Sequence, residues 1–502
     1  MENSGKDDAV SFDNIPTGLY YKKGGKWVTP PEGKLTKIPD DENGDLRRIR
    51  TKNYDIIFKQ LQSGGPSGYE SRYLTEEGEP AATGLYEELE KFDSGLPIVS
   101  QRAIRQRNGA GLVDALNNEK TMGIASGFKP SGAVHFGHKL TASTIVYFQR
   151  NGAQVFIPVA DVEAGTEKKL MESDPSLSRR KRYEYWAADN LLDWGANGIN
   201  LDAAHVYLQS EEKRASEMAA GLIATINFDF AIDTYKFEKL AENFPFLFAG
   251  ASQAADIILP QHPDFANYHS FMVSGPDQDG HMTMTLEMIK NSLSSVNPVA
   301  GLQTVPSAFY IPHMRGLTGN KASSSQPDST LFVGAGPQKL SLADRLKTET
   351  EKLSYSIANT TEATEFCALD MVRYLREFNR YNKINFREIC ENPPASVNDS
   401  LKAAKTPEER SRIMSHYLVG ECEKNGQYNC DIVQQHLKDE LLSHYDRRTE
   451  VYEYALARAQ GRKTSQPSFW TPLPSRAIVD ESKRNRTKWY DIVNELKNDL
   501  MV

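Results

Sequence analysis

The pattern of hydrophobic and polar positions divides the 502-residue chain at about residue 120. Before that point Gly, Pro and charged side chains interrupt the apolar stretches, most densely at residues 63–68. Turn-forming residues at such density predict short elements and no long helix or strand. We interpret residues 1–100 as an N-terminal extension.

After residue 120 the pattern predicts a strand, a turn, a helix and a second strand. Residues 122–125 and 155–160 are short apolar runs, typical of buried strands. Between them lie a glycine-rich turn at 126–132 and a helical stretch at 139–150. One face of that helix carries Leu140, Thr144, Ile145 and Phe148. Strand, turn, helix and strand make a βαβ unit, which predicts a parallel sheet covered by helices.

Similar strand signals recur at residues 271–333, and the pattern then becomes helical, as at 363–379 and 431–457. The expected fold class is α/β, with a Rossmann-like parallel-sheet catalytic domain, a helical C-terminal domain and the N-terminal extension. The expected bounds are 1–100, 101–345, 346–460 and, for a C-terminal tail, 461–502.

Composition and charge narrow the range of functions. Lys and Arg number 59 against 67 Asp and Glu, a net charge of −8, which argues against a protein that coats nucleic acid without selectivity. No apolar run is long enough to span a membrane. The four cysteines are scattered without a CxxC pair, so a metal site is not expected, and with the acidic start they indicate the cytoplasm.

The first motif with chemical meaning lies at the predicted start of the helix. His135 and His138 flank Gly137 there. The backbone N–H groups of a first helical turn attract phosphate, and glycine permits close approach. Two imidazoles at this place can donate hydrogen bonds to phosphate oxygens, although they can equally act as a local helix cap.

The second motif is a polar loop about 180 residues further on. Lys321 is followed by Ala322 and by the three hydroxyl residues Ser323, Ser324 and Ser325. A loop with one lysine and several hydroxyls can close over a triphosphate and neutralise departing pyrophosphate. Taken by itself, the same loop is typical of a solvated surface.

Together the two motifs resemble the signatures of the class I aminoacyl-tRNA synthetases, His-Ile-Gly-His and Lys-Met-Ser-Lys-Ser. They read HFGH at residues 135–138 and KASSS at 321–325. The resemblance implies that both motifs bind ATP, with Mg²⁺ on the triphosphate, and that they stabilise attack of an amino-acid carboxylate on the α-phosphate.

Within that class the chain is most similar to tryptophanyl-tRNA synthetases of the archaeal and eukaryotic type. The similarity rests on GFKPSGAVHFGHKL, on VFIPVADVEA and on residues 274–281, and it covers residues 120–460. It implies that Glu163, Gln253 and Gln278 hold the substrate α-amino group, and that Gly275 lets adenosine approach the backbone. An anionic carboxylate and two amide oxygens suit an ammonium ion.

The chain departs from the family pattern in three respects, which involve four positions. Ala322 replaces the Met of the lysine loop, and Ser324 its second Lys. Ala125 and Pro158 stand where eukaryotic members hold the indole N–H with Tyr and Gln. We interpret Asp277 as the substitute acceptor, and since it can also accept a phenol O–H, tyrosine stays an alternative substrate.

The resemblance also implies partners. These are tryptophan, a tRNA for tryptophan read by the helical C-terminal domain, and a second copy of the chain in a homodimer. Basic clusters at 179–182 and 483–486 are candidate tRNA contacts, although charge runs are usually solvated faces. A paralogue that has lost charging activity and serves as a binding protein is the rival interpretation.

Overall fold

The computed structural model describes a large part of the chain in segments. These are residues 21–23, 26–28, 105–107, 112, 115–116, 118–164, 179–235, 240–293, 302–311, 316–317, 322–334, 336, 340–358, 399–400, 402–403, 431–485, 487–498 and 500. Within the first hundred residues the description covers β1 (Tyr21–Lys23) and β2 (Lys26–Val28), which pair as an antiparallel ribbon.

A six-stranded sheet with the order β3-β8-β7-β4-β5-β6 forms the centre of the molecule. From one edge to the other, its strands are β3 (Arg105–Arg107), β8 (Ser307–Tyr310), β7 (His269–Ser274), β4 (Met122–Ala125), β5 (Gln154–Val159) and β6 (His205–Leu208). All neighbours pair in parallel except β3, which runs antiparallel to β8. The predicted parallel sheet and its first βαβ unit are therefore confirmed.

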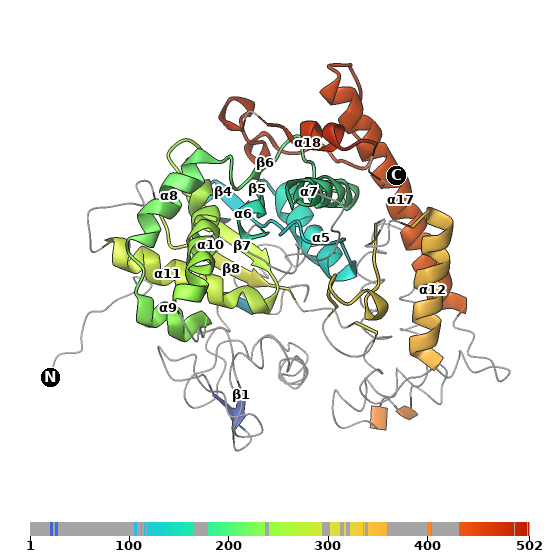
Figure 1. Cartoon of the computed structure of the whole chain (residues 1–502), viewed down its shortest axis with the longest axis horizontal. Helices are drawn as coiled ribbons and strands as arrows, with labels where there is room; N and C mark the ends of the chain where they lie inside the picture. The colour runs from blue at the N-terminus through green and yellow to red at the C-terminus, as the bar shows by residue number, and fades with distance from the viewer. Residues whose placement is uncertain are drawn as a thin grey trace.

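Helices cover both faces of the sheet, as Figure 1 shows. Alternate residues of β5 belong to different cores: Val155 and Ile157 pack with α5 (Phe136–Arg150) and α7 (Arg179–Ala196). Phe156 between them packs on the opposite face. That face is covered by α8 (Lys213–Ile223), α9 (Phe228–Tyr235), α10 (Leu240–Ile258) and α11 (Asp279–Leu293). Burial on both faces explains why these strands read as continuous apolar runs.

The predicted helical face at residues 139–150 is buried as expected, but the helix begins earlier, at Phe136. His135 acts as its N-cap, and histidine is not among the residues that usually signal a helix start.

Beyond the sheet, α12 (Leu342–Ala358) and α17 (Asp431–Ala459) confirm helical structure in the C-terminal region. Residues 363–379, also predicted to be helical, lie outside the described residues. Buried ion pairs join α17 to the helices α5 and α7 on the sheet. Arg448 binds Asp189 at 2.6 Å and Asp193 at 2.5 Å, both on α7, and the Lys139 amine of α5 binds Glu440.

The segment at 461–502 packs against this assembly through its described residues. Trp470 and Trp489 are each 4% exposed; Trp489 stacks on Tyr454 of α17, and Trp470 meets the same ring edge to face. The Trp470 indole N–H donates to the Gly195 carbonyl at 3.0 Å. The helix α18 (Trp489–Glu495) lies along α7 and α17. Among the described helices, none combines the length and apolarity that crossing a membrane requires.

Candidate active site

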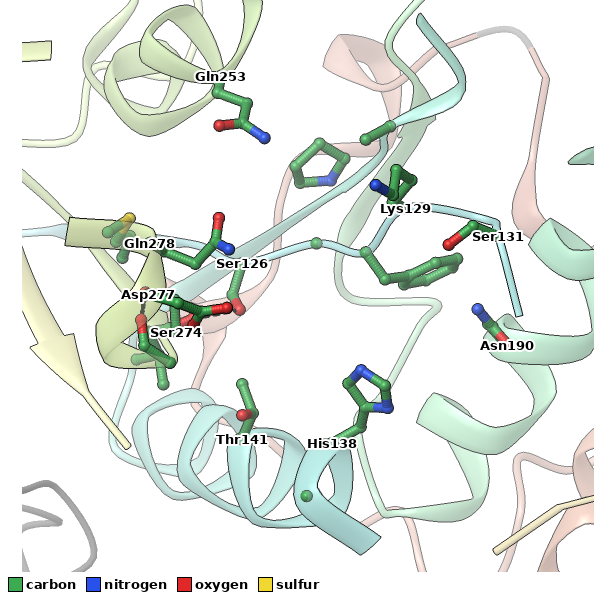
Figure 2. A pocket seen from close by; sticks show the side chains of 18 of the residues that line it. Ser126, Lys129, Ser131, His138, Thr141, Asn190, Gln253, Ser274, Asp277 and Gln278 are labelled. Carbon is green, nitrogen blue, oxygen red and sulfur yellow. Dashed lines mark hydrogen bonds between the residues drawn. The ribbon is translucent and has the colours of Figure 1, made fainter. Parts of the chain in front are cut away.

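A cavity of about 390 Å³ opens at the carboxyl ends of β4, β5 and β7. Parallel sheets bind ligands at this edge because the loops and helix N-termini converge there. Its walls come from the turn after β4, the start of α5, the short helix α6 (Asp161–Ala164), α10, the 3-10 turn η5 (Pro276–Gln278) and residues 322–324. Figure 2 shows side chains from the turn after β4, from α5, from α10 and from η5 facing one another across the opening.

The two histidines of the first motif stack at the base of the cavity. Their ring centroids are 3.9 Å apart with planes at 29°. The Gly137 N–H donates to His135 Nδ1 at 3.1 Å, and the His135 N–H donates to His138 Nδ1 at 3.2 Å. Because each Nδ1 accepts, these bonds assign the proton of each neutral ring to Nε2. The helix cap is therefore compatible with phosphate binding, since capping uses Nδ1 and leaves an N–H donor on the other side of each ring.

The lysine loop meets the first motif across this cavity. Lys321 itself lies outside the described residues, whereas Ser323 and Ser324 line the cavity. A Cβ added to Gly132 would meet the Ser324 Cβ at 2.8 Å, so the two loops are in close contact. Ser325 is exposed, does not line the cavity and bonds the Ser323 hydroxyl at 2.9 Å.

Ala322, which replaces a family methionine, is 3% exposed and belongs to the core cluster beneath the sheet edge. The position therefore keeps its buried environment although the side chain is smaller.

The residues assigned to the amino acid gather on the opposite wall. Gln253 of α10 donates from Nε2 to Glu163 Oε2 at 2.6 Å, and Lys129 lies 3.5 Å from Glu163 Oε1. The other amide atom, Gln253 Oε1, is buried with no hydrogen-bond partner among the described residues. Gln278 and Asp277 enter the cavity from η5 (Figure 2). An acceptor left unpaired at a cavity wall is suited to a ligand's N–H group.

Gly137 and Gly275, both assigned to ATP, also line the cavity. Every assigned residue within the described segments except Ser325 therefore lines one cavity, although the residues come from five separate stretches of the chain. The apolar parts of the wall include the two departures, Ala125 and Pro158.

A carboxyl group that sequence reasoning missed, Asp256, also lines the cavity. It is 4% exposed and accepts from the Tyr207 hydroxyl at 2.8 Å and from Gln209 Nε2 at 2.5 Å. Burial raises the pKa of Asp256 to about 7 against the effect of these bonds, and the negative charges of Glu212 and Asp161 add to the rise.

A signal for Asp256 was present. It is the only charged residue in the run Ala254 to Pro260, which is otherwise apolar and which the helix α10 buries. A lone carboxylate on a buried helical face needs a partner or a ligand. Its partners are Tyr207 on β6 and Gln209 directly after it, 49 and 47 residues away along the chain, a distance that local patterns do not bridge.

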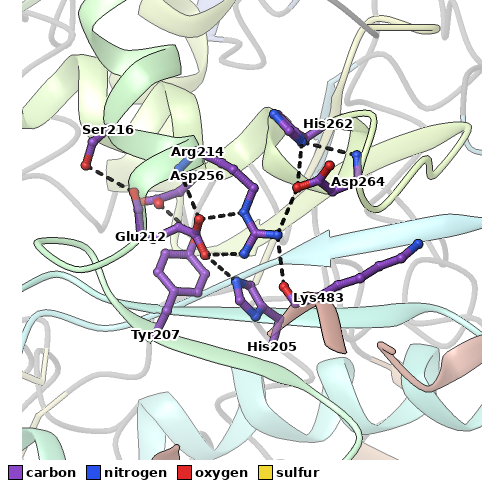
Figure 3. Close-up of polar contacts among 9 residues, drawn as sticks. All are labelled: His205, Tyr207, Glu212, Arg214, Ser216, Asp256, His262, Asp264 and Lys483. Carbon is purple, nitrogen blue, oxygen red and sulfur yellow. Dashed lines mark hydrogen bonds and ion pairs between the residues drawn. The ribbon is translucent and has the colours of Figure 1, made fainter. Parts of the chain in front are cut away.

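A second buried carboxyl group, Glu212, lies beyond Tyr207, away from the cavity lining (Figure 3). It binds His205 Nε2 at 2.7 Å and Arg214 Nε at 2.7 Å. Burial acts to raise the pKa of Glu212, but its hydrogen bonds to His205 and Arg214, with their charges, outweigh that effect and hold the pKa at about 2. Arg214 also donates to Asp264 and to the Lys483 carbonyl, tying residue 483 to the sheet edge.

The two basic clusters lie outside this cavity. Residues 179–182 open α7, and their side chains lie outside the description. In the second cluster, the Arg484 guanidinium donates to the carbonyl oxygens of Val479 and Asp202, which is a structural use of that charge. Lys483 is exposed, and Arg486 is outside the described residues.

Comparison with known proteins agrees with this geometry. The family model for tRNA synthetases class I (W and Y) matches residues 117–407, more than half of the chain. A tryptophan--tRNA ligase of Methanopyrus kandleri is 32% identical over 227 residues, covering 44% of this chain and 55% of that protein. One from Archaeoglobus fulgidus is 31% identical over 246 residues, covering 46% and 56%. The chain thus aligns with a little over half the length of these relatives.

Solved structures share the fold. A tryptophanyl-tRNA synthetase of Aeropyrum pernix superposes with a TM-score of 0.52 at 21% identity, covering 73% of this chain and 89% of that one. A tryptophanyl-tRNA synthetase from Encephalitozoon cuniculi bound to tryptophan gives 0.53 at 16% identity, covering 80% and 96%. With a family match over most of the sheet, and with both signature motifs at one cavity, the chain belongs to the class I tRNA synthetases of the W and Y family.

Proposed function

We propose that this protein is a tryptophan--tRNA ligase, which activates tryptophan with ATP and transfers it to tRNA. The observation that carries the proposal is the single cavity where the histidine motif and the lysine loop face the set Glu163, Gln253 and Gln278. The names of the archaeal relatives support tryptophan as the amino acid.

In the first step, a tryptophan carboxylate oxygen attacks the α-phosphorus of ATP. The bond from that phosphorus to the bridging oxygen breaks, and pyrophosphate leaves with the electron pair. His135 and His138 donate from Nε2 to phosphate oxygens as charge builds up, and Lys321 neutralises the leaving group. We propose that Mg²⁺ would be bound by oxygen atoms of the triphosphate. No side chain is needed as a covalent nucleophile, because positioning and electrostatics suffice.

The amino acid is held at the opposite wall. Its ammonium group is placed against Glu163, Gln253 Oε1 and Gln278, where one carboxylate and one unpaired acceptor already converge. Two carboxyl groups in the lining, Asp277 and Asp256, can accept the indole N–H. Asp256 is the better supported, because its partners are neutral donors and no cation within the described segments pairs with it.

In the second step, the tRNA 3′ end takes the aminoacyl group from the adenylate. The helices α12 and α17 are proposed to belong to the part that contacts the anticodon, and a homodimer is proposed from the family resemblance. The four scattered cysteines support a reducing, cytoplasmic setting.

The test is aminoacylation of a total tRNA preparation with labelled tryptophan, with labelled tyrosine measured in parallel. We expect charging with tryptophan and a loss of at least about 10-fold in Lys321→Ala, because that lysine carries a phosphate contact. Charging with tyrosine alone would show that the amino-acid substrate is tyrosine and not tryptophan. Charging with neither, in folded protein that binds tRNA, would favour the binding-protein alternative.

A further inference from the structure

The two ATP motifs are joined through a short segment at residues 330–333. Its Phe332 forms an antiparallel bridge with His135, and the flanking backbone bonds are Phe136 N–H to Leu331 O at 3.3 Å and Val333 N–H to Val134 O at 3.1 Å. This segment therefore lies directly beside the cap of the helix that carries the histidines.

The other end of the segment is bonded to the lysine loop. The Thr330 hydroxyl donates to the Ser323 carbonyl at 2.9 Å and accepts from the Ser323 N–H at 3.0 Å. Residues 330–333 therefore support both the lysine loop and the histidine motif, because a displacement of this segment moves Ser323 and the His135 backbone together.

Two charged residues of α12 hold this support. Glu349, 0% exposed, accepts the Phe332 N–H at Oε2, 3.1 Å away. Lys352 donates from Nζ to the carbonyl oxygens of Pro327 at 2.9 Å and Thr330 at 3.3 Å, and to Glu349 Oε1 at 3.1 Å. The three N–H donors of the ammonium group thus have three acceptors.

The remaining contacts make the arrangement directional. Arg345 donates to Glu349 Oε1 at 2.8 Å, and both Arg345 and Lys352 lie over the Phe332 ring, 5.9 and 5.3 Å from its centroid. Burying a carboxylate and two cations contributes little net stability compared with apolar packing, but it fixes atoms to particular partners. The contacts of Arg345, Glu349 and Lys352 therefore serve mainly to fix the position of residues 330–333.

We propose that Lys352, acting with Glu349, is a positioning residue for adenylate formation. The pair sets the lysine loop and the histidine motif at the separation that ATP requires, and it links that separation to α12, which packs against α17. The kinetic test of this inference, pyrophosphate exchange, rests on the proposed function. ATP binding gives a second test that does not depend on which amino acid is the substrate.

The test uses the full-length chain in three forms: wild type, Lys352→Met and Lys347→Met. Methionine keeps an apolar stem without the three donors, and Lys347 is an exposed lysine of the same helix, which makes it the matched control. We expect Lys352→Met to weaken ATP binding in calorimetry and to lower kcat for pyrophosphate exchange by about 10-fold or more, since small misplacements of reacting groups cost rates of this size. The KM for the amino acid should stay within about 2-fold, because no contact of Lys352 reaches that wall.

A conservative variant and a matched control separate the outcomes. Lys352→Arg, which keeps the charge and several donors, should recover part of the loss, and Lys347→Met should behave as wild type. Unchanged ATP affinity and kcat in folded Lys352→Met would overturn the inference. So would an equal rise in both KM values with a lowered melting temperature, which is the signature of general structural damage. If Lys352→Met does not fold, Lys352→Arg and Lys352→Gln are compared instead. The same result is expected: Lys352→Gln should lose more ATP affinity and kcat than Lys352→Arg, with the KM for the amino acid unchanged in both.

Failure of the proposed function looks different. In that case the wild type binds ATP but exchanges pyrophosphate with no amino acid, and the ATP affinities of the Lys352 variants still decide whether the pair positions the loop.

Discussion

Two buried carboxyl groups lie near β6, Asp256 and Glu212, and their different partners give them different pKa values. Both side chains are almost fully buried and both are bonded twice or more (Figure 3). Glu212 has the cation Arg214 beside it, and its pKa is held at about 2. Asp256 has a phenol and an amide, and its pKa is raised to about 7.

This difference in partners indicates that Glu212 has a structural role and that Asp256 is available to a ligand. Glu212 is already compensated and does not line the cavity, so it binds the sheet edge to α8 and to residue 483. Asp256 lines the cavity, and the amide oxygen of its partner Gln209 is buried and has no hydrogen-bond partner in the described part of the chain. A donor from the substrate would improve the environment of Asp256 and would add nothing to that of Glu212.

The largest expected effect is on stability, at the compensated group. Glu212→Gln leaves Arg214 in a partly buried position without its main counter-charge. We expect a loss of about 3 kcal/mol in the free energy of unfolding, measured by urea titration at pH 7. The amino-acid KM of the folded fraction should not change. A rise in KM at retained stability would reverse the roles assigned to the two carboxyl groups.

The next effect is on substrate binding, at the uncompensated group. Asp256→Asn keeps the shape of the side chain and removes the negative charge. We expect the KM for tryptophan in pyrophosphate exchange to rise about 30-fold, close to 2 kcal/mol for a hydrogen bond to a charged acceptor. Asp277→Asn is the matched variant on the other wall. If it carries the effect while Asp256→Asn does not, the indole acceptor is Asp277, as predicted from the sequence.

The two groups should also respond to pH with opposite sign. The raised pKa of Asp256 means that the folded protein keeps a proton that the unfolded chain releases near 3.8, so its contribution to stability falls as the pH rises from about 4 to about 7. The lowered pKa of Glu212 gives a contribution that is complete above 4.5 and is lost as the pH falls through about 2.

Urea titrations at pH 5 and pH 8 measure the first of these. Asp256→Asn cannot ionise, so its stability relative to wild type should rise by up to about 3 kcal/mol between pH 5 and pH 8. A constant difference between the two proteins would show that Asp256 does not titrate in this range.

The smallest effect is expected at the rim of the Glu212 network. Arg214 also pairs with Asp264 at 3.3 Å, but the Asp264 side chain is 54% exposed. Asp264→Asn should therefore change the unfolding free energy by less than about 0.5 kcal/mol, measured under the same conditions as Glu212→Gln. A loss as large as that of Glu212→Gln would mean that burial does not separate the two partners of Arg214.

Local patterns predicted the parts of the fold that depend on neighbours in sequence. The apolar runs became β4 and β5, and the turn between them became a wall of the cavity. The helix start was placed three residues late because a stacked histidine pair, and not a usual capping residue, begins α5.

The candidate site could be predicted as far as motifs mark it. His135 and Glu163 were found through the family pattern and lie at the same cavity. Asp256 was missed because its meaning depends on Tyr207 and Gln209, and the support at Phe332 was missed because it depends on a bridge to a residue almost 200 positions earlier. Such pairings are set by the topology of the sheet, which no short stretch of sequence contains.

The measurement that tests the account most directly is amino-acid-dependent exchange of pyrophosphate into ATP, run on the purified protein with each of the twenty amino acids. We expect exchange with tryptophan alone. Exchange with tyrosine alone would keep the adenylate chemistry and contradict the substrate. Exchange with none of the twenty, in folded protein supplied with tRNA, would contradict the enzymatic function itself.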